Sequence, residues 1–107
     1  MQIQINTDHT VKSSHEYKLE TENFRDALED SLEHFQKYIS KVEVHFSDTN
    51  AEKIGFDDKR CLIEVRLRGL NPVVTSHQAN NLALALDGAT LKLKKSLDHI
   101  FGKMKNH

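Results

Sequence analysis

The sequence contains very little of several residue types on which common functions depend. Cys61 is the only cysteine among 107 residues, so an internal disulfide and an all-cysteine zinc site are both excluded. There is one proline and no tryptophan, and the longest apolar runs are too short for a membrane-spanning helix. Residues 1–6 lack the basic start and apolar stretch of a signal peptide, and we expect a cytosolic protein. Length and composition predict one globular domain over residues 1–107.

Catalytic and metal-binding signatures are also missing. The chain has no glycine-rich phosphate loop, nucleophile elbow or calcium-loop motif, and its seven histidines lack paired ligand spacing. We therefore predict no enzyme, catalytic residue, cofactor, metal or small-molecule substrate. Cys61 falls on the inward side of a predicted strand and reads as a core residue. A small metal-binding or enzymatic domain in which His45, His77 and Cys61 meet on the sheet stays open as an alternative.

Total charge is small, but its distribution along the chain is uneven. Residues 1–53 carry six Lys or Arg and eleven Asp or Glu, a balance of −5, whereas residues 54–107 carry nine and five, a balance of +4. Together they give the formal net charge of −1. Such asymmetry indicates an anionic partner for one face of the protein. An unevenly charged, merely solvated surface is the alternative.

The hydrophobic pattern predicts an α+β fold. Alternation of apolar and polar residues predicts strands over residues 2–6, 41–47, 61–67 and 73–77, and helical spacing predicts helices over about 22–39 and 79–105. Residues 7–20 and 48–60 read as loops. The order β-α-β-β-β-α predicts a two-layer sandwich, in which a four-stranded sheet has two helices packed on one face.

Basic side chains gather on two of these elements. On the last helix, Lys92, Lys95, His99 and Lys103 fall within about 80° of one another, beside the apolar stripe, where they could follow a row of phosphates. On the third strand Arg66 and Arg68 point away from the core, and Lys59 and Arg60 lie at its entrance. The alternatives are a solvated lysine-rich face and pairing of Arg66 with Glu64 or Glu43. No aromatic pair is placed to stack bases, which favours recognition of RNA backbone and shape.

The first predicted helix carries the opposite charge. Its acidic residues lie opposite its apolar stripe and would repel phosphate; they are Glu22, Asp26, Glu29, Asp30 and Glu33. Contact with RNA must therefore be one-sided. This face is either solvated or meets a basic protein surface, and a protein–protein interaction module that uses it is our second hypothesis.

Several stretches resemble the ribosome hibernation-promoting factor and ribosome-associated inhibitor family, most closely its short stand-alone members. They are Met1 to Ile5, Tyr38 to Phe46, Val42 to Asp48, Asp57 to Cys61, His77, Ala85 to Ala89, and Lys92 to Leu97. The resemblance implies a β-α-β-β-β-α domain that binds the small ribosomal subunit between head and body, occupies the messenger and transfer-RNA channel, and silences idle ribosomes under stress. It also implies contacts with ribosomal RNA on matching basic positions, which are Lys92, Lys95, Lys103, Lys105 and Arg25.

Two departures from the family pattern affect these expectations. Family members commonly carry Lys or Arg along the first helix, where this chain has Glu29, Asp30 and Glu33, so the contact made by that helix is in question. The chain ends at His107 without the C-terminal dimerisation domain of long members, and direct pairing of ribosomes through such a domain is not expected. Our leading hypothesis is a cytosolic, non-enzymatic translation regulator that binds ribosomal RNA of the small subunit.

Overall fold

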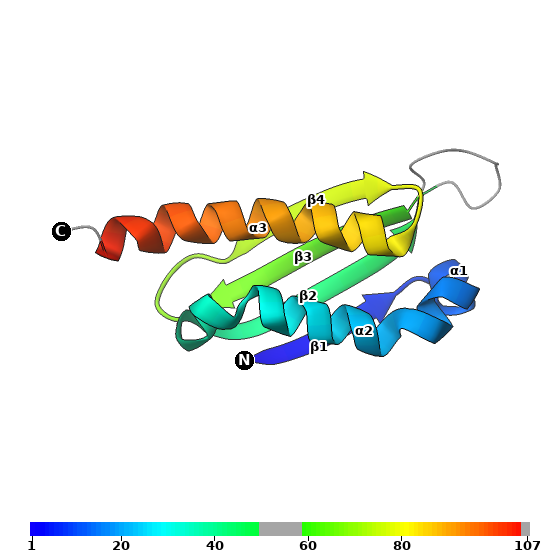
Figure 1. Cartoon of the computed structure of the whole chain (residues 1–107), viewed down its shortest axis with the longest axis horizontal. Helices are drawn as coiled ribbons and strands as arrows, with labels where there is room; N and C mark the ends of the chain where they lie inside the picture. Colours follow the sequence, from blue (N-terminus) through cyan, green and yellow to red (C-terminus); the bar gives the residue numbers. More distant parts are fainter. Residues whose placement is uncertain (50–58, 106–107) are drawn as a thin grey trace.

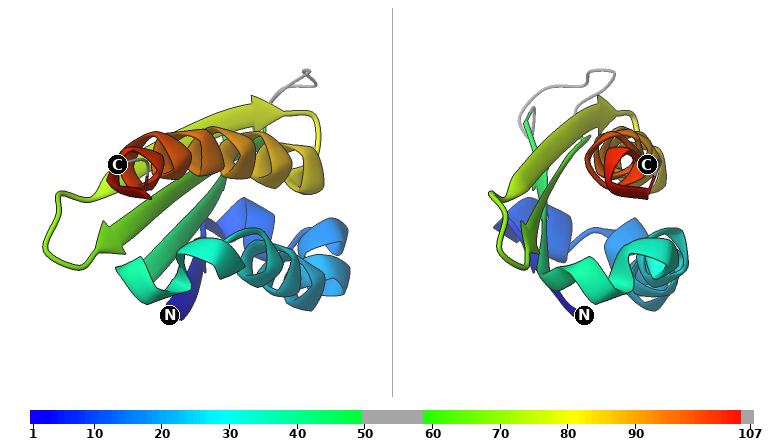
Figure 2. Two further views of the ribbon diagram at one scale, coloured as in Figure 1. Left: turned by 60° about the vertical axis from the view of Figure 1, so that its left-hand side comes forward. Right: turned by 90° about the vertical axis from the view of Figure 1, so that its left-hand side faces the viewer.

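The computed structural model describes residues 1–49 and 59–105, with side chains up to residue 102. Its elements are β1 (Gln2–Thr7), α1 (His9–Lys12), α2 (His15–Ser31), the 3-10 helix η1 (Glu33–Tyr38), β2 (Ile39–Asp48), β3 (Lys59–Leu67), β4 (Val73–Ala79) and α3 (Leu82–Lys105). The strands form one sheet in the order β1-β2-β3-β4, in which β1 pairs parallel to β2 and the other pairs are antiparallel. Helices α2 and α3 lie on the same face of this sheet (Figures 1 and 2). The predicted α+β class and its two-layer arrangement are confirmed.

The core lies between the sheet and the two long helices. Near one end, the ring of Phe24 on α2 packs 5.5 Å from that of Phe46 on β2. Near the other end, Tyr38 stacks on Phe101 of α3 with 4.0 Å between ring centroids. From helical spacing we expected Ile100 to be the buried residue of α3 at this level, but Phe101 is fully buried and Ile100 is partly exposed. Bulky residues on both layers therefore close the core at each end.

The prediction that residues 7–20 form a loop is wrong. Helix α1 occupies His9–Lys12, and α2 begins at His15. Each helix has a side-chain cap at its start: an Asp8 carboxylate oxygen accepts from the Val11 amide at 2.8 Å, and the Ser14 hydroxyl accepts from the Tyr17 amide at 3.2 Å. These caps satisfy first-turn amides, which stabilises short helices that have only a weak apolar stripe.

Two predicted helix boundaries also need correction. The helix expected over 22–39 ends at Ser31, and the 3-10 helix η1 follows it, because β2 already begins at the buried Ile39. The helix expected to start at 79 begins at Leu82 instead, because Ala79 still belongs to β4 and pairs with Lys59. Most of the loop expected over 48–60 lies outside the described residues.

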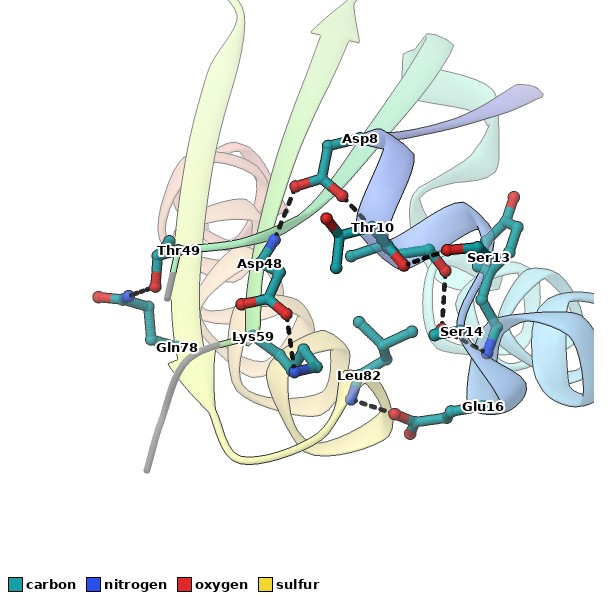
Figure 3. Close-up of polar contacts among 12 residues, drawn as sticks. Asp8, Thr10, Ser13, Ser14, Glu16, Asp48, Thr49, Lys59, Gln78 and Leu82 are labelled. Carbon is teal, nitrogen blue, oxygen red and sulfur yellow. Dashed lines mark hydrogen bonds and ion pairs between the residues drawn. The ribbon is translucent and has the colours of Figure 1, made fainter. Parts of the chain in front are cut away.

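A polar cluster at the end of β2 joins four segments of the chain (Figure 3). The second carboxylate oxygen of Asp8 accepts from the Asp48 amide at 2.8 Å. The Asp48 carboxylate in turn forms an ion pair with Lys59 at 3.1 Å across the β2–β3 pair. Gln78 on β4 donates to the Thr49 hydroxyl at 3.1 Å. The cluster ties α1 to the sheet and fixes the ends of three strands.

The start of α3 is capped by a residue from α2. The two carboxylate oxygens of Glu16 accept from the amides of Leu82 and Ala83 at 2.8 and 3.0 Å, and Figure 3 shows the bond to Leu82. The Asn81 side chain accepts from the Leu84 amide at 2.8 Å. A carboxylate at a helix N-terminus satisfies free amides and favours the helix dipole. Glu16 therefore holds the first turns of the two helices together.

We expect Glu16→Gln to lower the free energy of unfolding by about 1–3 kcal/mol, because two charge-assisted hydrogen bonds are weakened. Urea denaturation followed by circular dichroism measures the change. The control is Glu22→Gln, which alters an exposed carboxylate on the same helix and should change stability by less than about 0.5 kcal/mol. Equal effects of the two variants would contradict the capping role.

Candidate nucleic-acid interface

The basic flank of α3, defined as Lys92, Lys95 and His99, lies beside the edge strand β4. All three side chains are exposed, as their helical spacing predicted. The Lys92 ammonium donates to the backbone carbonyl of Ser76 on β4 at 2.9 Å. This contact shows that the flank overhangs the edge of the sheet instead of pointing straight out from the helix.

Close packing between α3 and β4 places the basic flank there. The His77 ring on β4 lies against Gly88, where any side chain would overlap the imidazole. One strand position further on the same face, the Thr75 hydroxyl donates to the Ala89 carbonyl at 2.9 Å. Because glycine lacks a Cβ, the helix backbone can approach the strand closely at this point. The approach fixes the rotation of α3 and so the direction of its lysines.

A groove of about 500 Å³ lies between the basic flank and the start of β4. Lys95 and His99 line it, together with Ser96 and Ile100 of α3, Pro72 of the β3–β4 connection and Val73 at the start of β4. Sequence reasoning missed the uncharged members of this set. These residues could have been found in the sequence only by assuming that α3 runs back antiparallel to β4. That arrangement brings Ser96 close to Val73.

The arginines of β3, defined as Arg60 and Arg66 in the strand and Arg68 directly after it, occupy the opposite face of the sheet. They alternate with the buried Cys61, Ile63, Val65 and Leu67, as predicted. Arg66 and Arg68 are exposed near the β3–β4 turn, whereas Arg60 lies about 20 Å away along the strand, between Ser47 and Gln78. The basic flank and the arginines therefore lie on either side of β4 and do not form one patch.

Glu43 attracts one of the arginines on this face, Arg66. Lys41 lies 3.0 Å from the Glu43 carboxylate and lowers its pKa below the ordinary value of 4.5, and the charge of Arg66 acts in the same direction. A lowered pKa means that the carboxylate stabilises the fold above pH 4.5 and that this contribution is lost as the pH falls through the lower folded value. Arg66 therefore interacts electrostatically with Glu43, which is one of the two partners that the sequence suggested.

Besides Lys92, two more of the predicted RNA-binding residues have a hydrogen bond or an ion pair within the protein. Lys59 is held by Asp48 in the cluster described above. Arg25 donates from Nη1 to the Ile3 carbonyl of β1 at 2.7 Å and so joins α2 to the other edge strand. Each of these side chains has a structural role, which leaves it less able to reach a phosphate. Lys103 and Lys105 belong to α3, but their side chains lie outside the described residues.

The structure brings together only two of the three residues of the metal-site hypothesis, because Cys61 and His77 are cross-strand partners on β3 and β4 whereas His45 lies apart. The His45 side chain lies 3.5 Å from Glu43 on the face of the sheet away from the helices, whereas His77 packs against Gly88 of α3. These two histidines are on opposite faces of the sheet, so the alternative in which all three residues meet is ruled out. Cys61 is fully buried, and burial raises the pKa of its thiol to about 12. Within the described residues, no cluster of three His, Cys, Asp or Glu could hold a metal ion.

The acidic residues lie over the other half of the sheet. Helix α2 covers the β1–β2 side and α3 covers the β3–β4 side (Figure 1). The acidic face of α2 is fully exposed and consists of Glu22, Asp26, Glu29 and Asp30, with Glu33 at the start of η1. The expected charge polarity is thus present in three dimensions, with cations towards β4 and carboxylates towards β1. Such a surface can attract phosphates on one side only.

Fold and surface define a small α+β domain with a one-sided basic flank and no arrangement for chemistry among its described residues. Residues 13–105 match the model of the sigma 54 modulation protein / S30EA ribosomal protein family. The chain belongs to this family, whose members are non-enzymatic ribosome-associated factors. The predicted family is confirmed.

Two solved structures have the same fold. A ribosomal subunit interface protein from Coxiella burnetii has a TM-score of 0.66 and 18% identity, with 95% of this chain and 99% of that chain covered. The N-terminal domain of Protein Y from Thermus thermophilus has a TM-score of 0.62 and 19% identity, with 94% and 99% covered. No sequence among curated proteins matches the chain. In the described part of the chain, no helix is long and apolar enough to cross a membrane.

Proposed function

We propose that this protein binds the small ribosomal subunit in the cytoplasm, occupies its messenger and transfer-RNA channel, and silences idle ribosomes under stress. The observation that carries this proposal is the basic flank of α3, exposed beside β4 in a chain of a ribosome-associated family. Inhibition would be steric, by occupation of a channel that messenger RNA needs, and would require no bond to be made or broken.

The flank of α3 is the part of the surface best suited to phosphate. Lys95 and His99 make no hydrogen bond or ion pair within the described residues, so the Lys95 ammonium and the His99 ring are available to a ligand. Lys92 keeps further ammonium protons beyond the one it donates to Ser76. The β3 arginines would form a second contact on the far side of β4, with Arg68 better placed than Arg66, because Glu43 attracts the latter.

Ribosome profiles of stationary-phase cells test the proposal. The protein should sediment with small subunits and whole ribosomes at low salt and should leave them as the salt concentration rises, because released counterions weaken phosphate contacts. Purified protein should also reduce translation of a reporter messenger RNA by purified ribosomes. Sedimentation only at the top of the gradient at low salt would contradict the proposal.

A further inference from the structure

The groove between α3 and the start of β4 has two walls of different chemistry. The apolar wall consists of Pro72, Val73 and Ile100. The polar wall comes from α3 alone and consists of Lys95, Ser96 and His99. The groove volume of about 500 Å³ lies within the range of about 300–1,000 Å³ that is usual for small-molecule sites. The groove can therefore hold a ligand, or one unit of a polymer, that is apolar on one side and polar on the other.

The apolar wall is held in place by the sheet and the core. Val73 pairs with Val65 of β3 and packs against the buried core residues. Ile100 of α3 is also partly buried against the core. The ring of Pro72 fixes its own backbone torsion, which leaves this residue little freedom. Because the wall is preformed, a flat apolar surface can contact it at a small cost in conformational entropy.

The polar wall offers three different groups within about one turn of helix. Lys95 and His99 are four residues apart, so their exposed side chains lie next to each other on α3. The His99 imidazole is the only aromatic ring among the described residues that line the groove. Ser96 is partly exposed there, and its hydroxyl can both donate and accept a hydrogen bond. An ammonium group, a flat ring and a hydroxyl thus face the apolar wall.

The charge at the groove selects an anion. Among the described residues no carboxylate lines it, and Lys95 supplies a positive charge. Lys92, one helical turn earlier, extends this charge along the flank beyond the groove. Asp98 is the nearest carboxylate along α3, but it does not line the groove. The ligand that suits both walls is therefore an anion that carries a flat, partly apolar group.

We propose that this groove holds one RNA nucleotide whose base has left the stack. The base lies between the His99 ring and the apolar wall, its phosphate contacts Lys95, and the Ser96 hydroxyl bonds to the ribose or to the base edge. The inference rests on the proposed function, because RNA is the ligand in both, and it deepens that function. The sequence favoured recognition of backbone and shape alone, whereas the groove adds one contact that requires an unpaired base.

Titration of the ¹⁵N-labelled full chain with short oligomers tests the inference without ribosomes. The probes have about five phosphodiester-linked units, all outer units being stable abasic ribose analogues and the central unit carrying uracil, cytosine, adenine, guanine or no base. We expect amide shifts at residues 73 and 95–100, and binding at least about fivefold tighter for the best base than for the baseless oligomer. Equal binding of all the oligomers would overturn the inference, as would the absence of binding, or shifts only at other residues.

Replacements of His99 separate its ring from any charge it carries. His99→Phe keeps a ring and should retain the fivefold preference for a base over no base. His99→Lys adds a charge and removes the ring, and the preference should fall below about twofold while the baseless oligomer still binds. The control is His15→Lys at the start of α2, on an exposed histidine outside the groove, which should leave the preference unchanged. An unchanged preference in His99→Lys would overturn the proposal.

Lys95→Gln tests where the phosphate lies. It should weaken binding of every oligomer by a similar factor, about threefold to tenfold, because a charged contact to phosphate is lost whether or not a base is present. The preference for a base should stay as it is in the parent protein. Loss of that preference with unchanged binding of the baseless oligomer would contradict the proposed arrangement.

Vesicles of phosphatidylglycerol and phosphatidylcholine cover a different amphipathic anion, the lipid surface. They should leave the signals of residues 73 and 95–100 unchanged, and changes there with vesicles but with no oligomer would overturn the inference. Because these titrations contain no ribosome, the two proposals can fail separately. Ribosome binding without any preference for a base would remove only the inference, whereas a base preference without ribosome binding would remove only the proposed function.

Discussion

Gly88→Ala should lower the free energy of unfolding by about 1–3 kcal/mol, although replacing glycine inside a helix normally stabilises it by up to about 1 kcal/mol. The reason for the reversal is the His77 ring, which lies where the new methyl group would be placed. The ring or the helix must therefore move, and the hydrogen bond from Thr75 to Ala89 in the same contact would be disturbed. Urea denaturation of the two proteins measures the difference.

The same substitution in a His77→Ala background provides the control. With the ring removed, the methyl group has room, and Gly88→Ala should then stabilise the protein by up to about 1 kcal/mol. The sign of the effect thus depends on one neighbouring side chain. Destabilisation of similar size in both backgrounds would show that Gly88 is needed for another reason.

Reversing two charges on the basic flank should have the largest effect on ribosome binding. We expect Lys92→Glu/Lys95→Glu to weaken binding to purified small subunits at least about 100-fold, because two contacts to phosphate of about 1.5 kcal/mol or more each are lost. The slope of log affinity against log salt should also fall by about 1.4–1.8 in magnitude. Sedimentation over a salt series measures both quantities.

The control changes the same net charge elsewhere on the surface. Lys12→Glu/Lys18→Glu alters two exposed lysines, on α1 and α2, and should reduce affinity by no more than about tenfold through long-range repulsion. Both double variants should keep the circular dichroism spectrum of the parent. Similar losses in the two double variants would show that ribosome binding depends on total charge and not on the flank.

The sheet could be predicted from sequence because each strand buries alternate residues. Val42, Val44 and Phe46 on β2 are all buried, and the polar residues between them are not, so a period of two is clear. The missed helical segments, α1 and the start of α2, lack such a pattern: α1 buries only Val11, and α2 begins nine residues before its first buried residue, Phe24. The caps Asp8 and Ser14 were visible in the sequence and could have placed both helix starts.

The sequence predicted which basic residues of the candidate interface share an exposed flank, but not the contacts that these residues make within the protein. Helical spacing correctly placed Lys95 and His99 on one exposed flank, because their position depends only on α3 itself. The contacts of Arg25 with Ile3 and of Lys59 with Asp48 depend on which segments the fold brings together. The hydrophobic periodicity of the sequence carries no information about that. The position of the flank beside β4 likewise depends on the contact between His77 and Gly88.

The acidic face of α2 changes which surface of this chain we expect to contact RNA. A basic first helix would allow RNA to contact both helices, whereas here the carboxylates lie over the β1–β2 half and the cations over the β3–β4 half. The net charge of −1 therefore describes neither side of the molecule. The protein should approach an RNA surface with β4 and α3 leading and with α2 turned away from it.

Site-directed hydroxyl-radical cleavage tests this orientation most directly. An iron chelate is attached to a cysteine introduced by Ser96→Cys, in the groove beside Lys95, or by Glu22→Cys, on the acidic face of α2. Cys61 can stay in place, because it is fully buried and the pKa of its thiol is about 12, so it does not react. On purified small subunits, the chelate at position 96 should cleave ribosomal RNA at defined sites, and the chelate at position 22 should cleave it weakly or not at all. Stronger cleavage from position 22 than from position 96 would contradict the account.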